Sequence, residues 1–412
     1  MNLSSYIAKR ITGHHKSSFS NFIIRLSTAA TVISVAVMII AAAVVQGFKD
    51  TIKDKAFEFW GHFHISQSTA TNDLMISPKP IPFDSGMVAS LKREPHILDV
   101  EPYTLGAGII ATELYNEGVR IKGVGPSYFK GSKDNVITYG GHPIRYNDTS
   151  YAADVILSQA ILDKIGKQAG DDVLLYVLDK EESLPRVRKV RIAGTYHMGI
   201  EEIDNNFILC DIKLLQRLYN WNDGQVTGYQ VLTDDYEHAD PVAEEVYFKY
   251  LSIPQTIVYI SDIYSEIFQW LELQNVNARI ILTIMAVVAV INMITALLTF
   301  ILERVNMIGI LKALGMNNWE VRKIFVYHIS RIVLKGILGG VLLGLFLCLL
   351  QYYFHIISID ESIYYMKYVP IKIVPWHVAG IIIGTFVVSV LILAVPTLII
   401  RKINIVEAIR YQ

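Results

Sequence analysis

The chain has 412 residues, of which 18% are charged, and its mean hydropathy is +0.37. Soluble domains contain about 25% charged residues, so this composition is unusual for a water-soluble protein, and it excludes a disordered chain, a collagen and a coiled-coil array. The length is enough for two or three domains, and the two cysteines, Cys210 and Cys348, are too few for a disulfide framework or a cysteine-based metal site.

The net charge of −1 conceals an uneven distribution along the chain. Between Lys49 and Glu272 there are 21 basic and 33 acidic residues, whereas the rest of the chain has an excess of basic residues. This division indicates that the two parts of the chain face different environments.

Four stretches are long, apolar and uncharged, and each covers the about 20 residues that a helix needs to cross a bilayer core. We predict transmembrane helices at residues 25–48, 279–302, 336–359 and 377–400. Buried helices of a soluble core rarely contain such long uncharged runs. The first stretch is longer than the apolar region of a signal peptide, about 7–15 residues, and is interpreted as an uncleaved anchor.

The short connections set the expected orientation. Basic residues dominate the amino-terminal flank, the loop at 303–335 and the tail at 401–412, whereas the loop at 360–376 has few. The positive-inside rule places both termini and the 303–335 loop in the cytoplasm. Residues 49–272 and the 360–376 loop are then external.

The external segment shows alternating strand and helix patterns, which predict a mixed α/β domain. Residues 171–179 and 186–196 read as a β-hairpin with a polar tip. Helical stalks are expected at both ends of the domain. Further strands are expected at 61–67 and 225–235, and helices at 84–97, 154–166 and 208–220.

Motifs of enzymes are absent from the sequence: it has no P-loop, no H-E-x-x-H, no C-x-x-C and no G-x-S-x-G. His62 and His64 could share a strand face as a metal pair, but no third ligand has a recognisable spacing. The group His197, Glu201, Glu202 and Asp204 could bind a cation, although a solvated acidic loop is the better interpretation. The sequence therefore predicts a non-enzymatic chain without a metal site.

The 303–335 loop contains a short apolar helix. Met307, Ile308, Ile310, Leu311 and Leu314 form a stripe, and Gly315 ends the helix. A second helix is expected to begin at Asn317 or Asn318. The stripe suits either docking of a soluble partner or contact with the membrane surface, and the residues alone favour neither.

Gly336, Gly340 and Gly344 recur every four residues in the third span. Small residues at this spacing allow close helix packing, within the chain or across a dimer. Ion-coupled carriers usually need charged residues inside the membrane. The spans contain none deep inside, so we expect a transporter that is powered from elsewhere.

Several of these segments together resemble the FtsX/MacB superfamily of ABC-transporter membrane subunits, and within it the lipoprotein-releasing LolC/LolE-type permeases. The opening segment with Gly47-Phe48, the GHFHIS strand and the segment INMITALLTFILERVNMIGILKALGMNNWEVRKIF carry the resemblance. The tail RKINIVEAIRY is similar to the family's ending, with Ile405 in place of its proline.

The resemblance implies an architecture. It is an α-helical membrane protein with a cytoplasmic elbow helix at 1–24, four transmembrane helices and a large MacB-like α/β domain between the first two. The chain would be a permease subunit that binds no cofactor itself, because ATP and Mg²⁺ would be bound by a separate ATPase. It would use mechanotransmission to extract lipoproteins from the inner membrane and pass them to a periplasmic carrier.

The resemblance also implies site residues. The ATPase would dock on residues 306–315, with Met307, Ile310, Leu311, Lys312, Leu314 and Gly315. The hairpin lies where LolC carries its carrier-binding hook; its tip, Lys180–Arg186, is short and closer to the LolE pattern, with Pro185, Arg186 and Arg188 as docking residues. The lipid cavity, between spans one and two of the paired subunits, would include Met38, Val45, Ile284 and Met285.

The implied partners are a LolD-type ATPase dimer, a second permease subunit (identical or a sister), the lipoprotein, a LolA-type carrier and membrane lipids, with no nucleic acid. The implied location is the bacterial inner membrane.

Two other functions stay open. One is a MacB-like exporter subunit for peptides or small molecules, although MacB usually carries its ATPase on the same chain. The other is an FtsX-like signalling scaffold for cell-wall hydrolases, whose external domain is typically much smaller.

Overall fold

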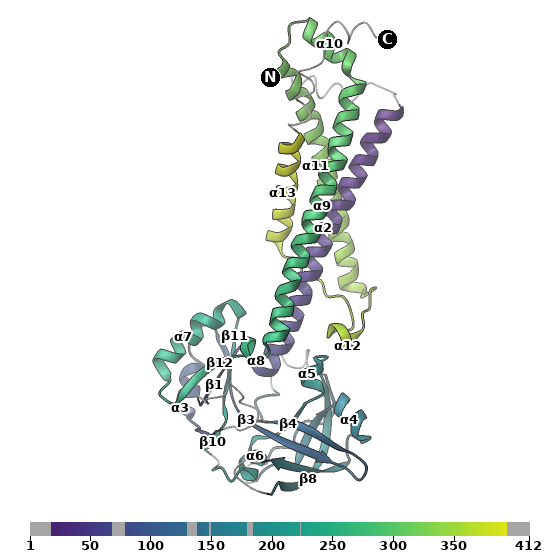
Figure 1. Cartoon of the computed structure of the whole chain (residues 1–412). Helices are drawn as coiled ribbons and strands as arrows, with labels where there is room; N and C mark the ends of the chain where they lie inside the picture. The colour runs from purple at the N-terminus through teal and green to yellow at the C-terminus, as the bar shows by residue number, and fades with distance from the viewer. Residues whose placement is uncertain are drawn as a thin grey trace. The chain divides into compact units, whose positions relative to one another are not determined.

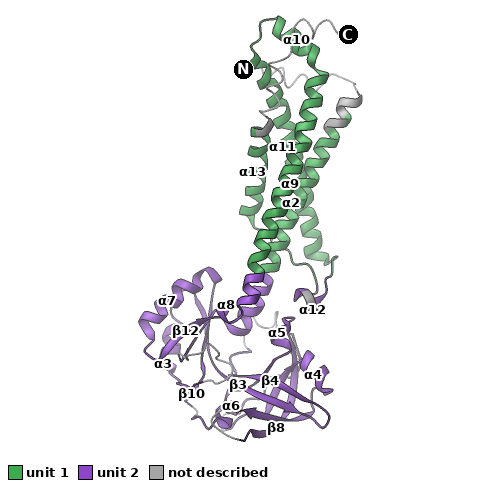
Figure 2. Ribbon diagram, in the orientation of Figure 1, with its two compact units in different colours: residues 1–49, 271–358, 368–412 green, residues 50–270, 359–367 purple. Residues whose placement is uncertain are grey.

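A computed structural model describes residues 18–67, 79–129, 138–147, 150–178, 184–222 and 224–393. The chain divides into two compact units, coloured separately in Figure 2. Unit 1 contains residues 1–49, 271–358 and 368–412, and unit 2 contains residues 50–270 and 359–367. Most of the predicted elbow helix and all of the predicted tail at 401–412 lie outside the described residues.

Unit 1 is helical (Figure 1). Its helices share one apolar core, in which Val35, Leu297 and Phe325 are buried. The described helices of this unit are α2 (Ser18–Trp60), α9 (Ser265–Glu303), α10 (Val305–Ala313), α11 (Asn318–Phe354) and α13 (Pro375–Leu393). Helix α2 belongs to unit 1 as far as Lys49, and α9 belongs to it from Leu271 onward.

Three described helices are long and apolar enough to cross a membrane: Arg25–Trp60, Ser265–Glu303 and Asn318–Phe354. The fourth predicted span corresponds to α13, which is a shorter apolar helix over Pro375–Leu391. Residues 394–400 of that span lie outside the described residues. The three apolar helices agree with the predicted fold class, and the number four stays a prediction.

Helix α11 joins the helix expected from Asn317 or Asn318 to the predicted third span. It begins at Asn318, where Asn317 and Glu320 form a capping box. It ends at Phe354 and does not reach Ile359, because His355 adopts a left-handed backbone with φ of 48° and closes the helix. The predicted span was too long at this end because the residues just after His355 are also apolar. A single turn, α12 (Glu361–Tyr364), follows in unit 2.

Unit 2 is a mixed α/β domain, as predicted, with a ten-stranded sheet and a separate two-stranded pair of β2 and β10 (Figure 1). Its strands are β1 (Phe63–Gln67), β2 (Ile81–Pro82), β3 (Ile97–Ala111), β4 (Asn116–Val124), β5 (Thr138–Gly141), β6 (Asp154–Ser158), β7 (Asp172–Leu178), β8 (Arg186–His197), β9 (Phe207–Asp211), β10 (Gln225–Val226), β11 (Gly228–Thr233) and β12 (Gln255–Tyr259). Its helices are α3 (Ser85–Leu91), α4 (Gln159–Ile165), α5 (Glu201–Asp204), α6 (Ile212–Leu218), η2 (Tyr236–His238), α7 (Ala239–Tyr250) and α8 (Ile260–Ile263).

The sheet encloses one of two apolar cores that the described residues of this unit form. Strands β3, β4, β9, β6, β8 and β7 pair in a closed ring, because β7 joins both β3 and β8. Only two pairs of the ring, β4 with β9 and β6 with β8, are parallel. The ring surrounds an apolar core that α4 and α6 complete. The second core lies between the β12–β1–β11 side and helices α3 and α7.

The predicted hairpin is confirmed, since β7 and β8 pair antiparallel. The helix predicted at 84–97 is shorter than expected, since α3 ends at Leu91 and Ile97 begins β3. Two further predicted helices are partly wrong. Residues 154–158 and 207–211 are strands, and helices begin only after Ser158 and Asp211, whose side chains cap α4 and α6. Each apolar run therefore serves a buried strand and then a helix, which hydrophobic periodicity alone does not separate.

Lys122 joins the end of α2 to the sheet within unit 2. This side chain of β4 is completely buried. Its Nζ donates to the carbonyl oxygen of Phe59, in the last turn of α2, and to Oε1 of Gln230 at 2.8 Å. The aromatic faces of Phe59 and Trp60 also lie against the ammonium group, 4.4 and 4.2 Å from their centroids. A buried charge needs such partners, so this contact holds the helix end firmly.

His197 and Asp204 do not lie in a solvated acidic loop, contrary to the expectation from the sequence, because both side chains are hydrogen-bonded within unit 2. Nδ1 of His197 lies 3.2 Å from Oδ2 of Asp204, and Nε2 lies 2.8 Å from Oε1 of Glu361. Asp204 is buried and accepts from the backbone N–H groups of Met198 and Gly199. The hydrogen bond to Asp204, followed by that to Glu361, raises the pKa of His197. These contacts tie the 359–367 segment into unit 2, whereas Glu201 and Glu202 are exposed as expected.

His62 and His64 are structural residues and not a metal pair. Nδ1 of His62 accepts from the backbone N–H of Thr233 at 3.0 Å. His64 donates from Nε2 to the carbonyl of Trp60 at 2.7 Å, and its Nδ1 lies 3.1 Å from the hydroxyl of Tyr103. Burial lowers the pKa of His62 to about 4 and, with Lys122 nearby, that of His64 to about 3. Both imidazoles are therefore neutral at pH 7.

Unit 2 is expected to lose stability on acidification between pH 6.5 and about 4. The unfolded chain takes up protons on both imidazoles in this window and the folded chain does not. The free energy of unfolding therefore decreases as the pH is lowered. Each unit of pKa difference corresponds to about 1.4 kcal/mol. Tryptophan fluorescence of the full chain should show a lower thermal midpoint at pH 5 than at pH 7, with a smaller decrease in His62→Asn. A decrease as large in His62→Asn as in the wild type would disprove this dependence, because the raised pKa of His197 acts in the opposite direction in both proteins.

Candidate functional site

A cavity of about 780 Å³ lies within unit 1, bounded by α2, α9 and α13. Its α9 wall follows one helical face, which includes Leu282, Ala286 and Val290. Small residues leave the space: Ala42 on α2, Ala278 and Ala286 on α9, and Gly380 and Gly384 on α13. The middle of the cavity is therefore an apolar space between membrane helices.

Polar groups gather at the end of the cavity near the start of α13. Asn275 and Arg279 lie in the first turns of the α9 wall, His377 lies in the first turn of α13, and Gln46 lies on α2. Lys49 is beside this end, because its Nζ donates to Oδ1 of Asn275 at 2.8 Å. The site thus combines a polar end with an apolar body, as an amphiphilic ligand requires.

Two of the four predicted cavity residues line this space, namely Met38 and Val45. Ile284 does not line it and is exposed on another face of α9. Met285 packs against the apolar core of unit 1. The prediction missed the wall from α13, although Gly380 and Gly384, four residues apart, were a readable signal of an open helix face.

The short helix α10 presents two of its predicted docking residues to solvent. Ile310 is 55% exposed and Leu314 is 80% exposed. Met307 and Leu311, predicted as further anchors, pack against the core of unit 1 beside the buried Ile308. Lys312 is half-buried. Gly315 has a φ of 90° and ends the helix at the expected position. The exposed surface is therefore narrower than the predicted stripe.

The three glycines of α11 face α2 inside the chain. A Cβ on Gly340 would lie 2.6 Å from Cβ of Val35, and one on Gly336 would lie 2.9 Å from Cβ of Thr31. Gly344 faces Ala36 in the same way. The backbones of these two helices therefore approach too closely for any side chain between them.

Gly47, half of the Gly-Phe pair of α2, serves a similar close approach. A Cβ at this position would lie 2.7 Å from the carbonyl oxygen of Pro370. The neighbouring N–H of Lys372 donates to the carbonyl of Ala43 at 3.1 Å. The glycine thus lets the segment before α13 pack directly on α2 within unit 1.

The hairpin residues are placed only in part, since 179–183 of the tip lie outside the described residues. Pro185 and Arg188 are exposed. Arg186 is half-buried, and its guanidinium donates to the carbonyl of Leu218 at 2.8 Å. Arg186 therefore has a structural contact at the loop end of the hairpin, whereas Pro185 and Arg188 are available to a partner.

Two family models match the chain. The MacB-like periplasmic core domain matches residues 26–246, and the FtsX-like permease C-terminal model matches residues 279–405. The chain therefore belongs to the family of proteins with a MacB-like periplasmic core domain, and its carboxy-terminal part is similar to the FtsX-like permeases. It is a membrane subunit of the ABC-transporter class with a periplasmic-type domain.

Curated relatives cover nearly the whole chain. It is 22% identical over 419 residues to the lipoprotein-releasing system transmembrane protein LolC of Xylella fastidiosa, with 96% of each chain covered. It is 23% identical to LolC of Neisseria meningitidis, covering 100% of this chain and 99% of the relative. It is 20% identical to LolE of Haemophilus influenzae, covering 85% and 83%.

A solved structure is also similar. The periplasmic region of MacB from Actinobacillus actinomycetemcomitans matches with a TM-score of 0.33 and 14% identity, covering 50% of this chain and 91% of that one.

Proposed function

We propose that this chain is the membrane subunit of an ATP-driven transporter that extracts lipoproteins from the inner membrane and passes them to a periplasmic carrier. The observation that carries the proposal is the cavity of about 780 Å³ with an apolar body and a polar end. The full-length similarity to proteins named LolC supports the same substrate class.

The cavity suits an acylated substrate. Each buried CH₂ of an acyl chain contributes about 0.8 kcal/mol, so an apolar space needs no charged group to bind it. The polar end, with Asn275, Arg279 and His377, would face the junction between the acyl chains and the polar part of the lipoprotein. We expect binding to depend on shape and apolar area more than on specific hydrogen bonds.

The energy would come from a separate LolD-type ATPase dimer, which would hold ATP and Mg²⁺, so this chain would need no cofactor of its own. Ile310 and Leu314 on α10 offer the exposed apolar contacts for such a partner. Both termini and α10 would lie in the cytoplasm, and unit 2 would lie in the periplasm. A second permease subunit, identical or a sister, would complete the transporter.

A LolA-type carrier would receive the lipoprotein at the hairpin of β7 and β8. Pro185 and Arg188 supply exposed contacts there, and Arg186 supports the loop end of the hairpin through its hydrogen bond to the carbonyl of Leu218.

Depletion of the protein in its own organism tests the proposal directly. Outer-membrane lipoproteins should accumulate in the inner-membrane fraction within one or two generations. Unchanged sorting together with greater sensitivity to drugs or peptides would replace the proposal with a MacB-like exporter. Unchanged sorting with defective cell-wall hydrolysis would replace it with an FtsX-like scaffold.

Filling the cavity provides a sharper test of the site. Ala286→Trp places a large ring into the apolar space between α9, α2 and α13, so we expect it to reduce lipoprotein release at least tenfold in the depleted strain. Val288→Trp is the matched control, because Val288 is exposed on α9 and does not line the cavity. Equal release by both variants would rule out the cavity as the substrate site. Inner-membrane retention of lipoproteins is the measurement.

A further inference from the structure

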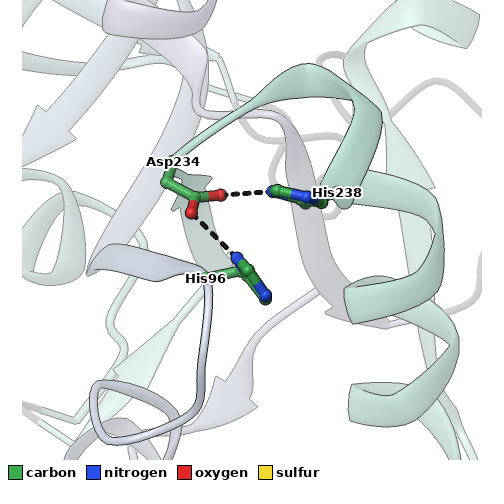
Figure 3. Close-up of side chains that lie close together, drawn as sticks. All are labelled: His96, Asp234 and His238. Carbon is green, nitrogen blue, oxygen red and sulfur yellow. Dashed lines mark hydrogen bonds and ion pairs between the residues drawn. The ribbon is translucent and has the colours of Figure 1, made fainter.

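Three side chains that none of the predicted sites includes meet at the surface of unit 2 (Figure 3). His96 lies in the turn before β3, Asp234 follows β11, and His238 is the last residue of η2. Nδ1 of His96 lies 2.8 Å from Oδ2 of Asp234, and Nδ1 of His238 lies 2.8 Å from Oδ1. One possible ligand atom from each of the three residues lies within 4.8 Å of the others.

The backbone holds this arrangement in place. The N–H of Asp234 donates to the carbonyl of His96 at 3.0 Å, so the two turns are joined directly. His96 has a φ of 66°, a left-handed conformation that is uncommon for residues other than glycine and is often found at functional positions. Asp235 caps η2 by accepting from the N–H of Glu237, which fixes the approach of His238.

We propose that His96, Asp234 and His238 form a binding site for a divalent transition-metal ion of the Zn²⁺ type. Two imidazoles and one carboxylate are a ligand set that Zn²⁺ and its borderline neighbours prefer, whereas Mg²⁺ and Ca²⁺ prefer oxygen ligands alone. Water would complete the coordination. With metal–ligand distances of about 2.0–2.2 Å, small side-chain rotations are enough to turn the three atoms onto one ion.

The ion would connect segments that are distant in sequence. His96 and Asp234 are 138 residues apart, and His238 leads directly into α7. A bound ion would therefore clamp the turn before β3 to the start of α7, both beside the second core of unit 2. Asp235 and Glu237 adjoin the site in sequence and add negative charge that attracts a cation.

Titration of the full chain with ZnCl₂ tests the site. The protein is purified in detergent, treated with EDTA and exchanged into buffer before calorimetry. We expect one high-affinity equivalent and a raised thermal midpoint that EDTA reverses. His96→Asn, Asp234→Asn and His238→Gln should each weaken binding at least about tenfold, since even changes around metal ligands cost 10–100-fold. Asparagine is chosen at position 96 because it tolerates the left-handed backbone.

His355→Asn is the matched control. His355 is also an exposed histidine with a left-handed backbone, at 48°, and it caps α11 outside the site. Zn²⁺ affinity should be unchanged in this variant. Absence of saturable binding in the wild type, or equal affinity in the three site variants and the control, would overturn the proposal. If a site variant fails to fold, electron paramagnetic resonance of Cu²⁺ bound to the wild type still tests the proposal. The spectrum must show two nitrogen ligands, and any other number of nitrogen ligands would overturn it.

Discussion

Leu314→Asp is expected to abolish ATP-driven transport while the chain stays folded in the membrane. Leu314 is 80% exposed, so an aspartate at this position disturbs no core contact. If the residue anchors the ATPase, the charge would lie in a desolvated interface. Loss of such an anchor costs about 2 kcal/mol or more, or roughly 30-fold in affinity. Co-purification of the ATPase with the variant and complementation of the depleted strain measure the effect, and Ile310→Asp should act in the same direction.

The control for this experiment is Leu114→Asp. Leu114 is 84% exposed and lies in the tight connection between β3 and β4 of unit 2. It should complement fully and retain the ATPase. If Leu314→Asp also retained the ATPase, the exposed face of α10 would be a membrane-surface contact, which is the alternative that the residue pattern left open.

Gly340→Leu is expected to separate α2 from α11 and prevent stable folding of unit 1. Even the single methyl of Gly340→Ala would place a carbon 2.6 Å from Cβ of Val35 and 2.8 Å from the carbonyl of Val32. Ordinary carbon contacts are about 3.5–4.0 Å, so the helices must move apart. Overpacking of this kind costs about 1–3 kcal/mol for alanine, and more for leucine. The thermal midpoint of the detergent-solubilised chain measures the loss.

Gly380→Ala is the matched control for stability. Gly380 is also a glycine within a membrane helix, but no atom lies within 4 Å of its ideal Cβ. Replacing glycine by alanine inside a helix favours the helix by up to about 1 kcal/mol. The midpoint should therefore stay the same or rise. A similar loss in both variants would show that the close approach at Gly340 does not explain the effect.

The elements that the sequence predicted well are those with a local signal. Long uncharged runs identified the apolar helices. The helices expected from residue 84 and from Asn317 or Asn318 begin close to those positions, where Asp84 and Asn317 cap them. The hairpin of β7 and β8 was readable because two alternating runs flank a polar tip. The strands β6 and β9 were missed because each runs directly into a helix through a shared apolar stretch.

The candidate sites were less predictable because they depend on which helix faces meet. All sides of α9 are apolar, so the pattern did not distinguish Ala286, which lines the cavity, from Ile284, which does not. The wall from α13 comes from a distant part of the chain. The same holds for His96 and Asp234, whose contact depends on the pairing of β3 with β11. Only the four-residue spacing of Asp234 and His238 was visible in the sequence.

The glycine contact between α2 and α11 also bears on how the cavity can change size. The contact sets glycines of α11 against β-branched side chains of α2 such as Thr31 and Val35, which have few rotamers to rearrange. These two helices are therefore expected to move as one rigid frame. The other walls of the cavity, α9 and α13, are held by side chains and by single hydrogen bonds such as that from Ser27 to the carbonyl of Asn292. Expansion to admit a bulky substrate would therefore be a displacement of α9 or α13 against a fixed pair, and not a loosening of the whole bundle.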